Sequence, residues 1–230
     1  MSKRSKRYQN TLKEAPKKPV SIAEAITFIK AHPGSKKFDE TVEVSMRLGA
    51  DTTKTDTPVR GTVKLPAGSG KKVKAVVFAG GDHAEEARAA GADFVGLDDL
   101  IEKVLGGWTD FDVAIATTEA MKSVRKCARV LGPRGLMPNP KTGTVTDDPA
   151  TAVKEAKAGK VDFRMDKTGN CCVIAGKLSF DADKLLANVN AVVEAVQAAR
   201  PAAVKGVFIK TLTLSSTMGI GVPCTLAAAE

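Results

Sequence analysis

The most constraining feature of this 230-residue chain is a change in its pattern near residue 71. From there to about residue 157, short apolar segments typical of strands alternate with segments typical of helices. Strands and helices that alternate at short intervals form βαβ units, in which helices cover both faces of a parallel sheet. Residues 71–157 are therefore predicted to form a small Rossmann-like α/β domain with three layers. The expected strands are 72–78, 93–96 and 111–116, and the expected helices include one capped by Asp82, one over 118–131 and one that begins at Pro149 after Asp148.

The two flanking segments have a different pattern. Residues 41–48 alternate between apolar and polar side chains, which predicts a half-buried strand, and residues 60–65 are expected to pair with it. Neither flank has enough elements to enclose a core alone, so residues 1–70 and 158–230 are predicted to form one discontinuous α+β domain. Residues 71–157 would then be an insertion, with two crossings near residues 70 and 158. Further expected elements are a helix after the Ser21–Glu24 capping box, strands at 161–165 and 172–178 joined by a hairpin turn, a helix over 185–196 and a strand-rich run over 206–216.

Charge is distributed unevenly between these parts. Thirty-five basic residues face 26 acidic ones, which gives a net charge of +9. The segment 71–157 holds thirteen of each sign, so the remaining 22 basic and 13 acidic residues carry the whole excess. A basic excess of this size favours a polyanionic partner. Because aromatic residues make up only 4% of the chain, recognition by base stacking is disfavoured.

Catalytic and cofactor signatures are weak throughout the sequence. The run Gly68–Lys72 imitates a phosphate-binding loop but lacks its earlier glycine and its following hydroxyl, and it precedes a strand. His32 and His83 have no partner at motif spacing, and the four cysteines lack C-x-x-C spacing, so we expect no metal, no cofactor and reduced thiols.

No apolar run is long enough to span a bilayer, and the basic N-terminus does not resemble a secretory signal, which predicts a cytoplasmic location. A nucleotide-binding enzyme built on the middle domain remains the alternative.

A second basic feature lies on the helix expected over 118–131. Four cations recur at helical spacing and would form one stripe, opposite a buried face of Met121, Val124, Cys127, Ala128 and Leu131. A solvated helix face is the ordinary interpretation of such a stripe. The loop that follows is rich in proline and glycine, so it would lose little entropy on binding. The possible secondary RNA contacts of this region are Lys122, Arg125, Lys126, Arg129, Arg134 and Lys141.

The segment LGPRGLMPNPKTGTV (131–145) resembles the signature of the bacterial branch of the large-subunit ribosomal protein L-one family, the mobile-stalk proteins beside the tRNA exit site. Further matching segments occur in the expected order along essentially the whole chain. They are KKFDETVEVSMRLG (36–49), VRGTVKLPAGSGK (59–71), AGADFVG (90–96), FRMDKTG (163–169) and TMG (217–219). The resemblance implies a split α+β RNA-binding domain with an inserted Rossmann-like domain.

The resemblance also implies a set of RNA-contacting residues. The basic side chains would neutralise RNA phosphates. The threonine hydroxyls and Glu43 would form hydrogen bonds with ribose 2′-hydroxyls and base edges. Gly219 would allow the protein backbone to approach the RNA closely. Phe38 and Met218 would offer apolar surface to riboses, although their pattern alone favours core packing. The implied RNA-binding residues are Lys37, Phe38, Thr41, Glu43, Arg164, Lys167, Thr168, Thr217, Met218 and Gly219.

For function, the resemblance implies a non-enzymatic constituent of the large ribosomal subunit, present there as a monomer. Such a protein would bind large-subunit ribosomal RNA at the stalk and assist release of deacylated tRNA from the exit site. It would also repress its own operon by binding the messenger RNA.

Overall fold

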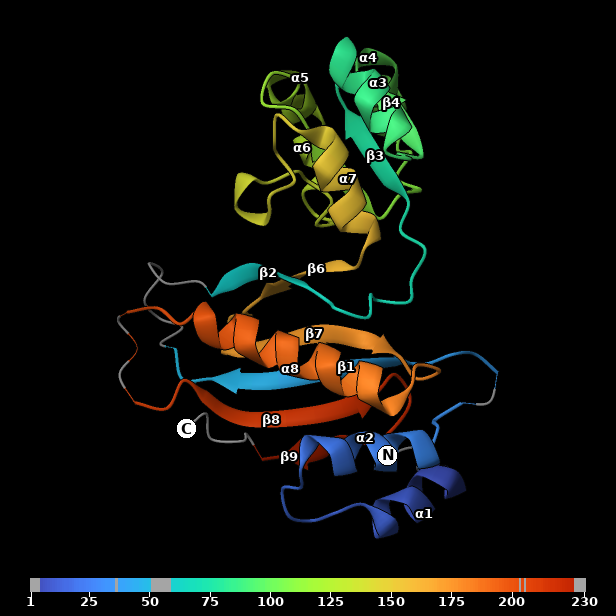
Figure 1. Ribbon diagram of the computed structural model, residues 1–230, viewed down its shortest axis with the longest axis vertical. Helices are drawn as coiled ribbons and strands as arrows, with labels where there is room; N and C mark the ends of the chain where they lie inside the picture. Colours follow the sequence, from blue (N-terminus) through green and yellow to red (C-terminus); the bar gives the residue numbers. More distant parts are fainter. Residues whose placement is uncertain (1–4, 36, 51–58, 203, 205, 226–230) are drawn as a thin grey trace. The chain divides into compact units, whose positions relative to one another are not determined.

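The computed structural model describes residues 5–35, 37–50, 59–202, 204 and 206–225. Two compact units can be distinguished, one formed by Met1–Gly70 with Val161–Glu230 and the other by Lys71–Lys160 (Figure 1). The second crossing between them falls three residues beyond the predicted position after residue 157. Lys160 stays with the second unit, where its ammonium lies 3.0 Å from the Glu155 carboxylate.

The first unit is built on a four-stranded sheet in the order β7-β1-β8-β9. Its central strand β1 (Thr41–Leu48) pairs antiparallel with β7 (Asn170–Lys177) on one side and β8 (Ile209–Ser216) on the other. The edge strand β9 (Val222–Cys224) comes from the tail, to which the sequence assigned nothing.

Two predicted strand pairings in this unit are wrong. Residues 60–65 do not pair with β1, because β7 and β8 already occupy both of its edges. Instead, β2 (Arg60–Lys64) joins β6 (Lys160–Arg164) in a separate two-stranded sheet. The predicted hairpin turn after β6 exists, but β6 and β7 belong to different sheets and are linked by a single bridge between Met165 and Cys171.

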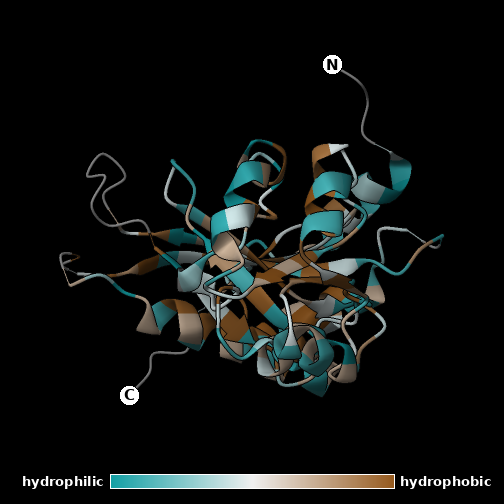
Figure 2. Ribbon diagram, turned by 90° about the horizontal axis from the view of Figure 1, so that it is seen from above, coloured by the Kyte–Doolittle hydropathy of each residue, from teal (hydrophilic) through white to brown (hydrophobic). Residues whose placement is uncertain are grey.

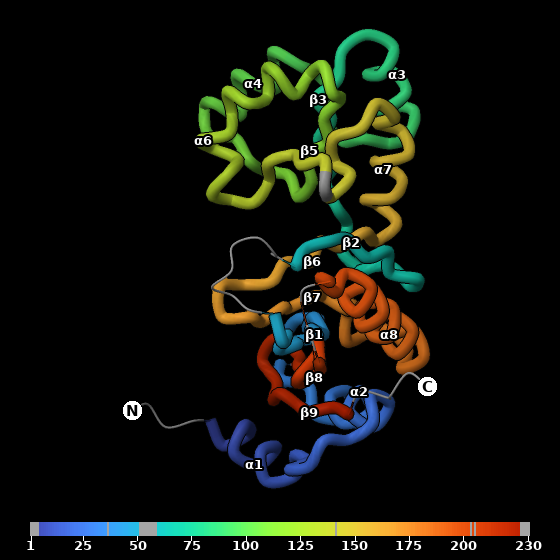
Figure 3. The backbone as a smooth tube through the Cα atoms, turned by 90° about the vertical axis from the view of Figure 1, so that its left-hand side faces the viewer, coloured from blue at the N-terminus to red at the C-terminus, as the bar shows by residue number. Residues whose placement is uncertain are grey.

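Within the described residues, helices cover one face of the four-stranded sheet and leave the other face open. Figure 3 shows α2 (Ile22–Ala31) and α8 (Ala182–Ala198) on the same side of it, and their apolar faces share one core with the buried residues of β1. Those residues are Val42, Val44, Met46 and Leu48. Since successive side chains of a strand point to opposite faces, the alternate residues of β1 face away from this core. A further helix, α1 (Lys6–Glu14), lies in the basic N-terminal segment, where the sequence predicted no helix.

Asn188 is a polar residue in the apolar core, on the buried face of α8. Its side-chain amide donates to the carbonyls of Gly68, at 3.0 Å, and Ala175, at 2.6 Å. Its oxygen accepts from the backbone N–H of Ala67 at 3.0 Å. One side chain therefore satisfies three backbone groups and ties the chain near residue 67 to α8 and β7.

The second unit contains a parallel sheet in the order β4-β3-β5, with β3 (Ala75–Phe78) at its centre. Val76 and Phe78 pack toward α4 (Asp98–Leu105), α5 (Met121–Val124) and α6 (Ala128–Leu131). On the opposite face, Val77 packs toward α3 (Asp82–Ala89) and α7 (Pro149–Lys157). The outer strands are β4 (Phe94–Gly96) and β5 (Val113–Ala116). Figure 2 shows that the strands are largely hydrophobic and that the helices carry hydrophilic residues outward. The combination of helices and sheets confirms the predicted mixed α/β class.

Two helix predictions in this unit need correction. The segment expected as one helix over 118–131 consists of α5, the 3₁₀ turn η1 (Arg125–Cys127) and α6. The tighter three-residue turn buries Val124 and Cys127 but leaves Ala128 exposed, although Ala128 was expected in the core. At α3, Gly81 occupies the N-cap, and Asp82 is the first helical residue.

We predict that Asn188→Ala lowers the free energy of unfolding of the first unit by about 3 kcal/mol, because two carbonyls and one N–H lose their buried partner. Guanidinium unfolding followed by circular dichroism measures the change. The exposed Asn190→Ala on the same helix is the matched control and should have little effect. Trp108, the single tryptophan, reports the second unit by fluorescence, and its transition should not shift. Equal stability of the two variants would contradict the prediction.

Candidate nucleic-acid interface

Segments far apart in the sequence meet at the N-terminal end of β1. The backbone N–H of Thr217 donates to the Thr41 carbonyl at 3.1 Å, and the N–H of Thr41 donates to the Thr217 hydroxyl at 3.0 Å. From β7, the Lys177 ammonium donates to the Thr41 hydroxyl at 3.0 Å. Thr41 and Thr217 of the predicted site are therefore direct neighbours, and residues 37–43 lie beside the turn 217–219.

A buried carboxylate holds this arrangement together. Glu40 is only 1% exposed, and its two oxygens accept separate backbone N–H groups, one from Ser35 and one from Met218 at 3.2 Å. The Glu40 carbonyl accepts from the N–H of Leu178 at 2.8 Å. A buried carboxylate is tolerated only when such donors satisfy it. Sequence reasoning missed Glu40, because an acidic residue before a strand gives no sign that its side chain turns inward.

Two glycines allow the backbones to approach one another here. A Cβ added to Gly34 would collide with the backbone of Met218, and one added to Gly219 would collide with the Ser216 hydroxyl. The close approach predicted at Gly219 therefore serves the packing of the turn itself.

The apolar residues of the predicted site are on the surface. Phe38 is 50% exposed and Met218 is 54% exposed, so the core-packing interpretation of these two residues is wrong. Lys37 and Thr217 are also exposed, and Glu43 is half-buried. In a protein whose other large apolar side chains are mostly buried, an exposed Phe and an exposed Met mark surface available for contact.

The second predicted group lies at the other end of β1. The turn at 166–170 lies beside Leu48, whose N–H donates to the Gly169 carbonyl at 2.8 Å. Thr41 and Leu48 are seven residues apart on β1, so the two groups are separated by roughly 20 Å. Arg164 and Lys167 are exposed there. The structure thus divides the predicted residues into two clusters on the same unit.

The hydroxyl of Thr168 is occupied within its own turn. It donates to the Asp166 carboxylate at 2.7 Å and accepts from the Asn170 amide at 2.8 Å. The Thr168 hydroxyl, followed by the backbone N–H groups of Asn170 and Thr168, lowers the pKa of Asp166. The turn is therefore held by an ionised aspartate, and the Thr168 side chain shapes it.

Between the two clusters lies the uncovered face of the sheet, which sequence reasoning missed. Its polar residues stand in cross-strand pairs, Glu43 with Ser215, Ser45 with Thr213 and Arg47 with Thr211. All six are half-buried or exposed. The alternation of polar residues in 209–216 was a usable signal, because it matches that of β1. The face is rich in hydroxyls, which can both donate and accept hydrogen bonds.

The predicted secondary contacts lie in the second unit. Lys122, Arg125, Lys126 and Arg129 are all exposed, and none of them forms an ion pair within the described residues. Arg134 donates to the Thr109 hydroxyl. The side chain of Lys141 lies outside the described part of the chain.

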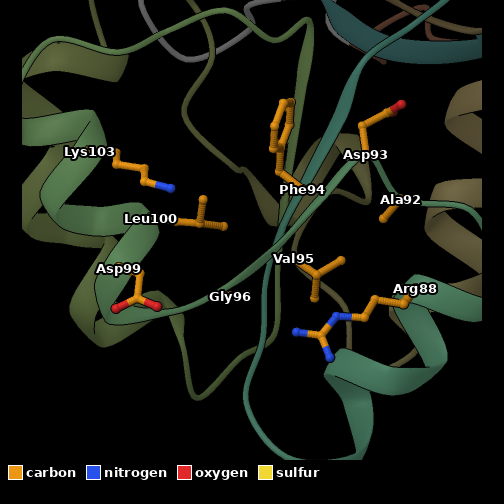
Figure 4. Close-up of a pocket in the computed structure, with 9 residues that line it drawn as sticks. All are labelled: Arg88, Ala92, Asp93, Phe94, Val95, Gly96, Asp99, Leu100 and Lys103. Atoms are coloured by element: carbon orange, nitrogen blue, oxygen red, sulfur yellow. The ribbon is translucent and has the colours of Figure 1, made fainter.

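The alternative of a nucleotide-binding enzyme finds little support in the second unit. A hollow at the β4 edge is lined by Arg88, Asp93, Phe94 and Lys103, among others, and contains no nucleophile with an adjacent base (Figure 4). The Asp93 carboxylate accepts the Ala75 N–H at 2.9 Å and lies 3.3 Å from the Lys157 ammonium. The Ala75 hydrogen bond, opposed in part by burial and aided by Lys157, lowers the pKa of Asp93, which makes it a poor proton acceptor.

Burial makes the Cys171 thiol a poor candidate nucleophile. All four cysteines are free, and burial raises the pKa of Cys171 to about 11, so this thiol stays protonated and unreactive at neutral pH. Among the described residues, no group of three or more His, Cys, Asp or Glu side chains is placed to hold a metal ion. The same residues include no helix that is long and apolar enough to cross a membrane.

Exposed cations and an open, hydroxyl-rich sheet face are typical of a protein that binds a polyanionic partner. The chain belongs to the Ribosomal protein L1p/L10e family, whose profile matches residues 29–220. It is 52% identical over 222 residues to "Large ribosomal subunit protein uL1" of Mycobacteroides abscessus, covering 96% of this chain and 94% of the relative. Proteins of the same name from Corynebacterium glutamicum strain R and Thermobifida fusca are 52% and 51% identical, with the same coverage.

We predict that Gly34→Ala displaces the turn 217–219 and weakens RNA binding by about tenfold, because the new methyl group cannot share space with the Met218 backbone. Gly80→Ala is the matched control, since a Cβ there meets no atom within 4 Å. Affinity for a folded large-subunit ribosomal RNA fragment is measured by titration. A Gly34→Ala protein that binds like Gly80→Ala would show that the close approach is unimportant for the surface.

Proposed function

We propose that this protein is a structural constituent of the large ribosomal subunit in the cytoplasm, and that its first unit anchors it to folded ribosomal RNA. The proposal rests on the surface around β1, where Glu40 fixes an exposed turn next to exposed Phe38 and Met218. It is supported by the relatives, each of which is named a large ribosomal subunit protein.

The chemistry of this surface suits structured RNA better than single strands. Lys37 supplies an exposed cation for a phosphate, and the hydroxyl oxygens of Thr41 and Thr217 would accept a hydrogen bond from a ribose 2′-hydroxyl. Phe38 and Met218 offer apolar area to ribose faces. Within the described residues, the half-buried Glu43 carboxylate forms no hydrogen bond or ion pair. Because a carboxylate only accepts hydrogen bonds, Glu43 would select an RNA donor such as an amino group or a 2′-hydroxyl.

The turn at 166–170 extends the same surface. Arg164 and Lys167 would meet phosphates at a distance from the first cluster, and the hydroxyl-rich sheet face would bridge the two. Two clusters about 20 Å apart fit a folded RNA element that follows the sheet and exceed the reach of a mononucleotide. The net charge of +9, all of it on residues outside 71–157, supplies the long-range attraction.

We extend the proposal to two finer roles of the same protein. In the first, the second unit, whose segment 71–157 is neutral overall, contacts deacylated tRNA in the exit site and so assists tRNA release. Its exposed cations Lys122, Arg125, Lys126 and Arg129 would make this contact. In the second, the first unit binds a similar RNA structure in the messenger of its own operon and represses translation. Both roles rest on the resemblance to the family and on the exposure of the residues concerned.

Salt dependence tests whether the first unit binds phosphates. The logarithm of the association constant should fall linearly with the logarithm of salt concentration, with a slope of about −0.7 to −0.9 per phosphate contact. Lys37→Ala or Lys167→Ala should each reduce this slope by about one contact. A slope near zero, or tight binding of a mononucleotide without RNA affinity, would overturn the proposal in favour of a nucleotide-binding protein.

A comparison of variants tests which unit is the anchor. Thr217→Ala leaves the Thr41 N–H without its partner, and Met218→Asp places a negative charge against RNA, so each should weaken specific binding by about tenfold or more. Arg125→Ala in the second unit removes one exposed cation and should weaken binding less than threefold. Equal or reversed effects would make the second unit the anchor.

A further inference from the structure

Lys177 is a basic residue of the first unit that lies outside the predicted RNA-binding set, and a β-bulge decides where its side chain points. Exposed and buried residues alternate along β7 only as far as Ala175. Two neighbouring residues of β1 then face Gly176 and Ile174, so Ala175 is the extra residue of the bulge. An extra residue reverses the face on which the following side chains lie. Lys177 therefore lies on the open face of the sheet, directly opposite Thr41.

The stem and the head of this side chain are both held. Gly70 packs so closely that a Cβ added to it would lie 2.8 Å from Cγ of Lys177. The Lys177 ammonium donates to the Thr41 hydroxyl at 3.0 Å and to the Asp39 carbonyl at 3.3 Å. A long side chain held in this way has already lost most of the rotamer freedom that binding would otherwise remove.

The positive charge of Lys177 is not neutralised within the described residues. Both partners of its ammonium are uncharged oxygens, and it forms no ion pair in this part of the chain. The Asp39 carboxylate is engaged by Ser179, whose N–H and hydroxyl donate to it at 3.1 Å and 2.8 Å. An ammonium has three N–H groups, and the contacts of Lys177 use two of them. One N–H and the charge are therefore available to an anionic ligand.

The surroundings of Lys177 belong to the first cluster of the candidate interface. Thr41, which accepts from it, donates its backbone N–H to the Thr217 hydroxyl. Lys37, the cation that the resemblance assigns to this cluster, is exposed, and its ammonium has no hydrogen bond or ion pair within the described residues. Such a side chain loses rotamer entropy when it binds a phosphate. Lys177 therefore offers the cluster a phosphate ligand with a smaller entropic cost.

We propose that Lys177 is the fixed phosphate-binding cation of this surface, aimed by the bulge of β7 at an RNA phosphate beside Thr41. The inference rests on the proposed function and names a residue that carries its electrostatic part. Charge complementarity and continuity with Thr41 and Thr217 select an RNA phosphate as the occupant. A charged donor makes a shorter and stronger hydrogen bond to a phosphate oxygen than a neutral donor does. The adjoining ribose would then lie against the two threonine hydroxyls.

The first experiment measures affinity for a folded large-subunit ribosomal RNA fragment over a series of salt concentrations. Lys177→Gln removes the charge but keeps an amide that can donate to the Thr41 hydroxyl. The slope of the logarithm of the association constant against the logarithm of salt concentration should become shallower by about 0.7 to 0.9, the value for one phosphate contact. At about 0.1 M salt, this change corresponds to a roughly five- to eightfold loss of affinity.

Two further variants separate the charge of Lys177 from its packing. Lys177→Arg keeps the charge and its donors, so it should keep the wild-type slope even though its larger head group weakens binding somewhat. Lys184→Gln is the matched control, because Lys184 is an exposed cation on α8, which covers the opposite face of the sheet (Figure 3). The slope of this variant should equal that of the wild-type protein.

The second experiment follows the side chain in the RNA-free protein. ¹³C relaxation at the ε carbons of labelled lysines measures the order of each side chain on a fast timescale. Lys177 should be more ordered than Lys37, because its ammonium is bound to Thr41 and Asp39. Equal order of the two side chains would contradict a fixed cation.

The salt series also separates the role of Lys177 from RNA binding itself. If the wild-type protein binds RNA and Lys177→Gln leaves the slope unchanged, Lys177 only supports Thr41, its role as a phosphate ligand is wrong, and RNA binding stands. If the wild-type protein binds no RNA at any salt concentration, the proposed function and the role of Lys177 fail together.

Discussion

The buried carboxylate of Glu40 is the interaction on which the candidate surface depends. Its two oxygens satisfy one N–H before β1 and one after β8, which joins segments that are 178 residues apart. A carboxylate removed from water must keep such partners, because an unsatisfied buried charge costs several kcal/mol. The cost of burying Glu40 thus fixes the position of the turn 217–219. The exposed residues Phe38, Thr217 and Met218 are presented on that support.

The one-sided packing of the sheet explains why a binding surface exists beside this support. Helices α2 and α8 bury the apolar residues of β1 on one face only, so the alternate residues remain accessible. An antiparallel sheet tolerates such an open face when it is polar. Here the open face carries Ser and Thr hydroxyls, flanked by cations at both ends. The parallel sheet of the second unit has helices on both faces and offers no comparable surface.

The two units also differ in electrostatics. The segment 71–157 is neutral overall, and its exposed cations on α5, η1 and α6 are balanced by acidic residues elsewhere in that unit. The flanking segments carry the excess positive charge, and one of their basic elements, α1, lies directly against the proposed RNA-binding turn. Positive charge and surface geometry therefore coincide on the first unit. This coincidence favours the first unit as the anchor.

The sequence alone determined the alternation of strands and helices in 71–157, the capping box at Ser21, the strand at 41–48 and the location of the excess charge. These features depend on local periodicity and composition, which are written in consecutive residues. The residues proposed to contact RNA came from the resemblance to a family, and their role stays a prediction. Sequence reasoning also found the turn at 166–170, because Asp, Gly and Asn favour turns locally.

Only the tertiary structure decided which strands pair and which polar side chains turn inward. Both edges of β1 were taken by strands more than 120 residues away, so the adjacent segment 60–65 was left to pair with β6. The buried roles of Glu40 and Asn188 depend on backbone groups brought to them by distant segments. The position of Lys177 on the open face likewise depends on a bulge that exists only where β7 pairs with β1. Long-range hydrogen bonds leave no local periodicity in the sequence, and for that reason they could not be predicted from it.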